Sequence, residues 1–412
     1  MPKTESKRAS KKAPKVGVWL IGARGGLATT LIVGARMMAR GLTGTTGLIT
    51  ETMPFDRANL CSIKDMVFGG HDVREISLID SAHEIMRDSG SLNAEHIEAV
   101  SDDLKAIDAE IQSGTAVNCG GAITSIAGPS SRRESRTLSG VLKNIQGDLE
   151  GFRRTHELDE LIVVNVASTE PPLKLTKEHQ SMAGFRRLIA GNKKQQVRAS
   201  SLYSWAALSS GCPFLNFTPS NACLLPAHEK LAKSRGLPLM GNDGKTGETL
   251  VKTALAPMFH HRNLKVMSWQ GYNILGDRDG QVLGNDENKA SKLETKDGVL
   301  PSILGYPLHT HVAIDYVPSL SDLKTAWDFV HFQGFLDFKM SLQFTWQGCD
   351  SILAAPIVLD LVRLTERSHR LGESGLMPQL ACFFKGPMGV EEHDFHAQYM
   401  SLMDYILRTQ KS

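Results

Sequence analysis

Lysines at short spacing are the first residues of this sequence that could do chemistry. Lys292 and Lys296 lie four residues apart in the segment SKLETK, so on a helix they would share one face. Two like charges at that spacing lower each other's proton affinity, which would let a lysine exchange protons or hold an anion near neutral pH. A solvated lysine face without a chemical role is the alternative. Lys385, in FFKGP, is a lone cation after apolar residues and could equally lie at the end of a strand.

A second candidate is the segment GNDGKTGET at residues 241–249. A helix that starts at Thr246 would leave its first backbone amides free, and Lys245 would add a cation nearby. This combination suits a phosphate monoester, whose ligands would be Lys245, Thr246, Gly247 and Glu248. The glycine spacing is not that of a Walker A loop, and an ordinary capped helix explains the segment equally well.

A glycine-rich turn near the start of the sequence could bind a dinucleotide. The apolar segment VGVWLI at Val16–Ile21 predicts a buried parallel strand, and a helix is predicted over Leu27–Arg40. Between them lie Gly22, Ala23, Arg24, Gly25 and Gly26. Free amides at a helix N-terminus favour a pyrophosphate, although the spacing is only a variant of G-x-G-x-x-G and a merely tight turn is the alternative. Glu51 is a candidate for binding the ribose.

Strands and helices alternate over the first ~240 residues, which indicates a doubly wound α/β domain. Further elements of this part are predicted as strands at Thr45–Thr50, Leu161–Ala167, Gln196–Ser201 and Pro213–Phe217, and as helix over 83–115. After residue 250 the pattern changes to longer strands suited to a mixed or antiparallel sheet. These are predicted at Leu264–Gly271, His309–Val317 and Leu336–Gln347, and a helix follows at Ser351–Ser368.

The composition narrows the class of protein. The chain has 412 residues, 41% hydrophobic and 22% charged, with a net charge of +2, which is typical of a soluble enzyme and gives no basic field for nucleic acid. Gly17–Ala35 contains Arg24 and several glycines, so we expect no membrane insertion. None of the six cysteines forms a C-x-x-C pair, so no metal site is predicted, and their scatter fits a reducing cytoplasm. Residues 1–13 are expected to form a disordered basic arm.

Taken together, these motifs resemble those of the inositol-1-phosphate synthase family, and they follow the family's order from Val16 to about Pro387. Besides the segments above, the resemblance rests on FGGHD at 68–72, ASTE at 167–170, NFTPSN at 216–221, YNILGDRDG at 272–280, LAAPIVLDL at 353–361 and KGP at 385–387.

The resemblance implies an NAD-dependent conversion of D-glucose 6-phosphate to 1D-myo-inositol 3-phosphate. The steps would be oxidation at C5, enolisation, intramolecular aldol cyclisation and return of the hydride, with no net redox change. It also implies a discontinuous Rossmann-like NAD-binding domain at 14–250 and 355–412, and a catalytic and oligomerisation domain at 251–354. The family is usually tetrameric, so we expect a homotetramer that acts on a small sugar phosphate.

By matched position, the resemblance assigns roles to individual residues. The catalytic set is Lys292, Lys385, Asp360, Asp243, His311 and Asp279, with Lys385 and Asp360 as a paired acid/base unit. The phosphate would be held by Lys296 with Lys245, Thr246, Gly247 and Glu248. NAD would be bound by Gly22, Ala23, Arg24, Gly25, Gly26, Asp72, Ser168, Thr169, Asn221 and Asp243.

Two departures from the family pattern keep alternatives open. His311 stands where a further family lysine is expected, and Glu248 replaces a glutamine. A carboxylate near phosphate would be unfavourable, and an imidazole offers no permanent charge. The alternatives are a related NAD-dependent cyclase or dehydrogenase for another phosphosugar, and a catalytically weak NAD-binding paralogue.

Overall fold

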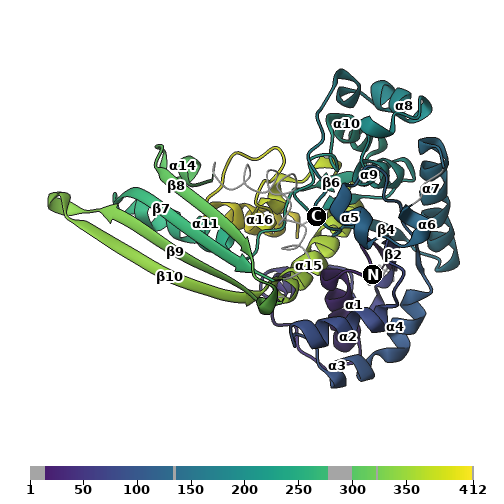
Figure 1. The fold of residues 1–412 in the computed structure, drawn as a ribbon, viewed down its shortest axis with the longest axis horizontal. Helices are drawn as coiled ribbons and strands as arrows, with labels where there is room; N and C mark the ends of the chain where they lie inside the picture. Colours follow the sequence, from purple (N-terminus) through teal and green to yellow (C-terminus); the bar gives the residue numbers. More distant parts are fainter. Residues whose placement is uncertain (1–13, 133–135, 277–298, 322, 411–412) are drawn as a thin grey trace, which may run out of the picture.

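The computed structural model describes residues 14–132, 136–276, 299–321 and 323–410. Its strands form a seven-stranded parallel sheet and a separate four-stranded mixed sheet, which confirms the predicted α/β fold (Figure 1). The large sheet contains β1 (Val16–Ile21), β2 (Val67–Asp72), β3 (Ile111–Ser113), β4 (Glu160–Asn165), β5 (Phe214–Asn216), β6 (Pro238–Met240) and β11 (Gly375–Leu376).

The order of the large sheet is β11-β6-β5-β4-β1-β2-β3. Apart from β11, this is the strand order of dinucleotide-binding folds, in which ligands bind where the order reverses beside the first strand. Strand β1 lies at this point between β2 and β4, and all six of its residues are buried, as the apolar run VGVWLI predicts.

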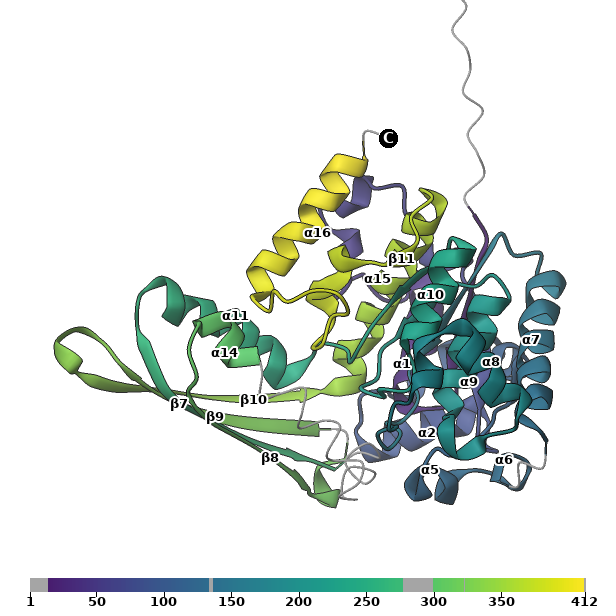
Figure 2. The same cartoon turned by 90° about the horizontal axis from the view of Figure 1, so that it is seen from above.

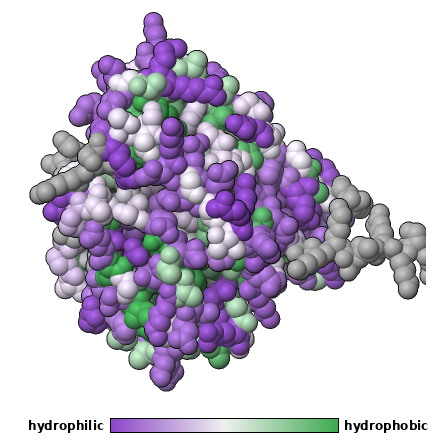
Figure 3. Space-filling view, turned by 90° about the vertical axis from the view of Figure 1, so that its right-hand side faces the viewer, coloured by the Kyte–Doolittle hydropathy of each residue, from purple (hydrophilic) through white to green (hydrophobic). Residues whose placement is uncertain are grey.

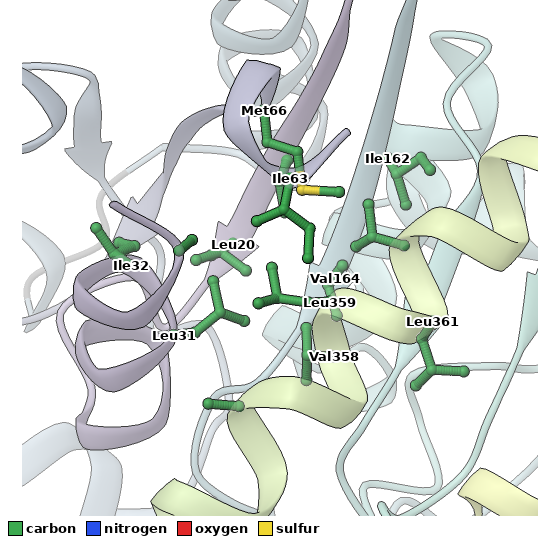
Figure 4. Packing of buried hydrophobic residues seen from close by; sticks show 14 of the residues in the cluster. Leu20, Leu31, Ile32, Ile63, Met66, Ile162, Val164, Val358, Leu359 and Leu361 are labelled. Atoms are coloured by element: carbon green, nitrogen blue, oxygen red, sulfur yellow. The ribbon is translucent and has the colours of Figure 1, made fainter. Parts of the chain in front are cut away.

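Helices cover both faces of the large sheet. One face packs against α1 (Gly26–Ala39) and α15 (Asp350–Arg370), where Leu20, Leu31 and Val358 belong to one buried cluster (Figure 4). The other face packs against α7 (Leu138–Thr155), α9 (Ala199–Ser209) and α10 (Pro226–Arg235). The remaining helices of this part are α2 (Leu78–Asp88), α3 (Ala94–Ala99), α4 (Ser101–Asp108), α5 (Gly121–Ile126), α6 (Pro129–Arg132), α8 (Met182–Ala190) and α16 (Phe395–Thr409).

Three predicted elements of this part are wrong. The second strand is β2, and Thr45–Thr50 is instead irregular chain that ends in the 3-10 helix Ile49–Glu51. The charged stretch 83–115 is broken into α2, α3 and α4, and it ends in strand β3. Gln196–Ser201 is not a strand, since α9 begins within it at Ala199.

The smaller sheet has the order β10-β9-β7-β8 and mixes parallel and antiparallel pairs. Its strands are β7 (Lys265–Leu275), β8 (His309–Tyr316), β9 (Leu323–Gln333) and β10 (Lys339–Cys349). Helices α11 (Gly247–His261) and α14 (Val299–Leu304) cover one face, and no described helix covers the other (Figure 2). The alternating burial along β9 reflects this one-sided core.

The surface of the larger part is mostly hydrophilic on the face drawn in Figure 3, where hydrophobic residues lie in small scattered groups. Within the described residues, no helix combines the length and the apolar character that crossing a membrane requires.

Candidate active site

A single cavity of about 510 Å³ opens at the carboxyl ends of β1, β2 and β4. One end is lined by the glycine turn after β1 and by α2, and the other end by the 241–246 segment, Lys385 and the start of α15. Along the sequence, the 241–246 segment lies more than 200 residues after the glycine turn, and Lys385 and the start of α15 lie more than 300 residues after it. The reversal of strand order beside β1 brings these segments together.

The glycine turn has the geometry of an anion-binding helix start. Gly22 has a φ of +86°, and a Cβ there would lie 2.8 Å from Ala167 Cα, so the position requires glycine. Helix α1 has no side-chain cap and no acidic residue in its first turn. A Cβ on Gly26 would meet no atom within 4 Å, so space is open beside the helix start. These features fit the pyrophosphate of NAD.

Asp72 ends β2, which is the position of the ribose-binding acid in dinucleotide-binding folds. Its carboxylate accepts hydrogen bonds from the amides of Arg24 and Arg74, both at 2.7 Å, and burial raises its pKa. The carboxylate can accept further bonds from ribose hydroxyls. Glu51 does not serve here, because it forms an ion pair with Arg363 at 2.5 Å.

The other predicted NAD ligands divide into two groups. Ser168 and Thr169 line the cavity, whereas Asn221 is exposed outside the lining and its amide bridges both backbone groups of Leu173. Ala23 is fully buried behind the turn. The sequence prediction missed Glu170, a buried carboxylate in the cavity wall that accepts a bond from the Ser200 amide at 3.0 Å.

Lys385 and Asp243 form the charged pair at the other end of the cavity. Lys385 Nζ donates to Asp243 Oδ1 at 2.9 Å, and the two residues are 8% and 5% exposed. Their backbones are joined as well, since Lys385 N donates to Asp243 O at 2.7 Å and Asn242 N donates to Gly386 O at 2.9 Å. Asp243 Oδ2 is buried and has no hydrogen-bond partner among the described residues, so it retains the capacity to accept a hydrogen bond.

The predicted pairing of Lys385 with Asp360 is therefore wrong. Asp360 lies within α15 and accepts bonds from the amides of Ile49 and Thr50 and from the Thr50 hydroxyl. Burial raises the pKa of Asp360 to about 6. This carboxylate holds the 3-10 helix before β2 and does not line the cavity.

Lys245 also lies away from the predicted phosphate position. Its Nζ donates to Gln398 Oε1 at 2.5 Å and lies 5.8 Å from the centre of the Phe395 ring. Burial lowers its pKa to about 8. The lysine thus ties the 241–247 turn to α16.

Glu248 points into a buried charge cluster beneath the smaller sheet. Its carboxylate pairs with Lys252 one turn further along α11 and accepts a bond from Asn273 Nδ2 at 2.6 Å. Lys252 also lies 3.6 Å from Asp328, whose pKa is raised by burial and by the Glu248 charge. The side chain of Glu248 is therefore paired with a lysine that it shares with Asp328, and only its backbone amide remains a candidate phosphate ligand.

Three further residues surround the start of α11. Thr246 is the N-cap of α11 and lines the cavity, and its hydroxyl lies 3.5 Å from Asp350 Oδ1. Asp350 also lines the cavity and pairs with Lys324 at 3.3 Å. The sequence prediction missed Lys324, because strand β9 was not predicted, and it also missed Asp350 at the start of α15. The signal that could have revealed Asp350 is its position as an acidic residue directly before the predicted helix Ser351–Ser368.

His311 lies on the far side of the smaller sheet. It is exposed on the edge strand β8, outside the cavity lining, with its ring 5.8 Å from that of Tyr272. Its predicted catalytic role is thus not supported by its position.

Lys292, Lys296 and Asp279 lie outside the described residues and remain predictions. Among the residues that the structure does describe, no three His, Cys, Asp or Glu side chains are grouped so as to hold a metal ion.

Comparisons with known proteins identify the family of this chain. The model of the myo-inositol-1-phosphate synthase family matches residues 16–408. Inositol-3-phosphate synthase 1 of Bacteroides thetaiotaomicron is 32% identical over 93% of this chain and 91% of its own length.

Two solved structures share the fold. The inositol-3-phosphate synthase of Caenorhabditis elegans has a TM-score of 0.85 at 22% identity, over 97% of this chain and 86% of its own. A myo-inositol-1-phosphate synthase-related protein from Thermotoga maritima has a TM-score of 0.76 at 22% identity, over 95% of this chain and 98% of its own. Because the family model spans nearly all of the sequence, the chain belongs to the myo-inositol-1-phosphate synthase family.

Proposed function

We propose that the chain converts D-glucose 6-phosphate to 1D-myo-inositol 3-phosphate, with NAD as a cofactor that is regenerated in each turnover. One observation carries the proposal: a single cavity joins the glycine turn after β1 to the Lys385–Asp243 pair and to Thr246. A dinucleotide at the turn and a sugar phosphate at the pair would meet in one cleft.

The chain's own residues would position the sugar and stabilise its developing charge. NAD, when bound, supplies the acceptor for the C5 hydride and returns that hydride at the end. Lys385 Nζ is aimed by Asp243 and would donate to the sugar oxygen on which negative charge develops. Asp243 Oδ2 would accept a hydrogen bond from a hydroxyl of the same sugar.

The phosphate would bind at the start of α11. This helix has 15 residues and no side-chain cap, so its first amides can point at an anion, while the Thr246 hydroxyl donates to Asp350. Lys324 would add positive charge beside Asp350. Lys292 and Lys296 would complete the site, as the family resemblance implies.

The structure weakens the case for another substrate that Glu248 and His311, the two departures from the family pattern, suggested. The Glu248 carboxylate is turned toward Lys252 and Asn273 beneath the smaller sheet, so it does not face a phosphate at the helix start. His311 lies outside the cavity lining, so it does not replace a lysine of the site. We therefore favour D-glucose 6-phosphate, the substrate that the family resemblance implies.

The proposal is tested by incubating the purified chain with D-glucose 6-phosphate and NAD+. The product is measured as phosphate released after periodate oxidation, and NADH is followed by its ultraviolet absorbance. We expect product without net NADH. Accumulation of NADH in step with substrate loss would identify a dehydrogenase instead, and binding without turnover would identify an inactive paralogue.

We further propose that the chain assembles as a cytoplasmic homotetramer through the open face of the smaller sheet. Tyr272 and Trp327 are 42% and 39% exposed on that face, with ring centres 5.6 Å apart. The row continues to Phe329 and His331 along β9. An exposed aromatic row on a sheet without covering helices is typical of a protein interface.

A further inference from the structure

The cavity end beyond Asp72 combines apolar surface with paired charges. Ile85, Ile123 and Ile126 line this end and offer an apolar site for an adenine ring. Arg74 and Glu84 line it too, and Arg74 Nη2 donates to Glu84 Oε2 at 2.7 Å. The adenosine of a dinucleotide would therefore lie beside an arginine that already has a partner.

The position of the Arg74 guanidinium is fixed from two sides. Its Nη1 donates to the carbonyl oxygen of Arg24 at 3.0 Å, while Glu84 holds Nη2. The side chains of Arg74 and Glu84 are only 13% and 24% exposed, so solvent weakens this pair less than a surface ion pair. The Arg74–Glu84 ion pair is therefore a fixed part of the cavity wall.

The second arginine of this region is neutralised in the same way. Arg24 Nε donates to Asp108 Oδ1 at 2.9 Å, and that oxygen also accepts the Leu78 amide at 3.1 Å. Asp88 lines the cavity one helical turn after Glu84. Among the described residues that line this end, three carboxylates (Asp72, Glu84 and Asp88) thus accompany one guanidinium, that of Arg74.

NADP differs from NAD by a phosphate on the ribose hydroxyl next to the acid that ends the second strand, and NADP-binding folds meet this phosphate with an arginine. We propose that Glu84 strengthens the exclusion of NADP by the ribose-binding acid Asp72, because Glu84 occupies the Arg74 guanidinium and adds negative charge where the 2′-phosphate would lie. This inference rests on the proposed function, which requires a dinucleotide in the cavity.

The test measures the dissociation constants of NAD+ and NADP+ by calorimetry, for the full chain and for Glu84→Ala and Glu84→Gln. For the natural chain, we expect NADP+ to bind at least about tenfold more weakly than NAD+. Each variant should improve NADP+ binding about tenfold and leave NAD+ binding within about threefold, since Arg74 becomes available to the phosphate. Adding Arg74→Ala to Glu84→Ala should abolish the gain, and Glu95→Ala, at an exposed acid of α3, should change neither constant.

The outcomes separate the two proposals. Equal binding of both dinucleotides to the natural chain would overturn the role of Glu84, and so would unchanged NADP+ binding in variants that still bind NAD+. If the natural chain binds neither dinucleotide, the proposed function fails and this inference fails with it. Two different substitutions at Glu84 are used in case one of them disturbs folding. A variant that still binds NAD+ is correctly folded at this site.

Discussion

The pairing of Lys385 with Asp243 is the most informative contact at the scale of single residues. Lys385 and Asp243 lie on the segments 383–388 and 241–245, which share five backbone hydrogen bonds in addition to the side-chain bond, so the ammonium has a fixed direction. A buried, aimed cation is worth more to a developing oxyanion than a mobile surface lysine, because little reorganisation is needed during the reaction.

Replacing Lys385 by Met should lower kcat by about 10²–10³-fold, which is the usual cost of removing one oxyanion donor. NAD+ binding should persist, because the glycine turn lies at the other end of the cavity. The measurement is product formation together with NAD+ affinity. Lys105→Met, at an exposed lysine of α4, is the control and should be fully active. Activity of Lys385→Met within threefold of the natural chain would contradict the assignment.

Asp360 should make stability depend on pH. Burial raises its pKa from 3.8 to about 6 in the folded chain, so the folded state binds this proton more tightly than the unfolded state. The contribution is therefore fully present below about pH 4 and is lost as the pH rises through about 6, with a total of about 3 kcal/mol.

Urea unfolding of the natural chain and of Asp360→Asn between pH 4 and 7 checks this sign. All other titrating groups are common to the two proteins, so the difference between their free energies of unfolding isolates Asp360. As the pH rises, the natural chain should lose stability relative to Asp360→Asn. A constant difference, or one that shifts the other way, would show that the pKa is not raised.

For single residues, the sequence predicted which side chains lie in the site better than it predicted which side chains they contact. The resemblance led to Lys385, Asp243 and Thr246, which lie together in the cavity lining. Partners across long sequence distances could not be read in the same way. Asp360 is an isolated charge in an apolar helix, and only the packing of α15 on the segment before β2 reveals that it binds Thr50 and not a lysine.

At the scale of elements, the buried charge cluster ties α11 to the smaller sheet. Glu248 and Lys252 lie on α11, Asp328 on β9 and Asn273 on β7. Because α11 begins at the cavity, this cluster fixes the helix start that we propose binds phosphate.

Lys252→Met should lower the free energy of unfolding by about 3–5 kcal/mol, because it leaves two buried carboxylates without their shared cation. Chemical denaturation measures the loss. The matched control is Lys265→Met at the exposed start of β7, which should cost less than about 0.5 kcal/mol. A loss below about 1 kcal/mol for Lys252→Met would mean that the cluster adds little to the packing of α11.

The elements that the sequence predicted well are those with strong local patterns. The apolar runs of β1 and β4 and the long helix α15 lie close to their predicted bounds. Strand β2 was not predicted, because FGGHD has two glycines where a strand usually has β-branched residues. The structure explains them: a Cβ on Gly70 would lie 2.2 Å from the carbonyl oxygen of Leu20 on the neighbouring strand.

At the scale of the whole molecule, the smaller sheet projects from the larger part with one face open (Figure 1). If that face joins the subunits, Trp327→Glu should shift the tetramer to smaller species, because it places a charge within an aromatic row. Light scattering after gel filtration measures the mass. Leu42→Glu, at a 54% exposed leucine elsewhere, should leave the mass unchanged. A natural chain that is monomeric, or a Trp327→Glu chain that remains tetrameric, would contradict this interface.

Under the proposed function, one sugar is oxidised and then reduced in the same cavity, so the hydride taken from C5 must return to that sugar. The direct test is turnover of D-glucose 6-phosphate that carries deuterium at C5, with mass spectrometry of the inositol phosphate formed. We predict that the product retains the deuterium and that free NAD+ acquires none. Product without the label, or deuterium in NADH released to solution, would contradict the proposed return of the hydride to the sugar.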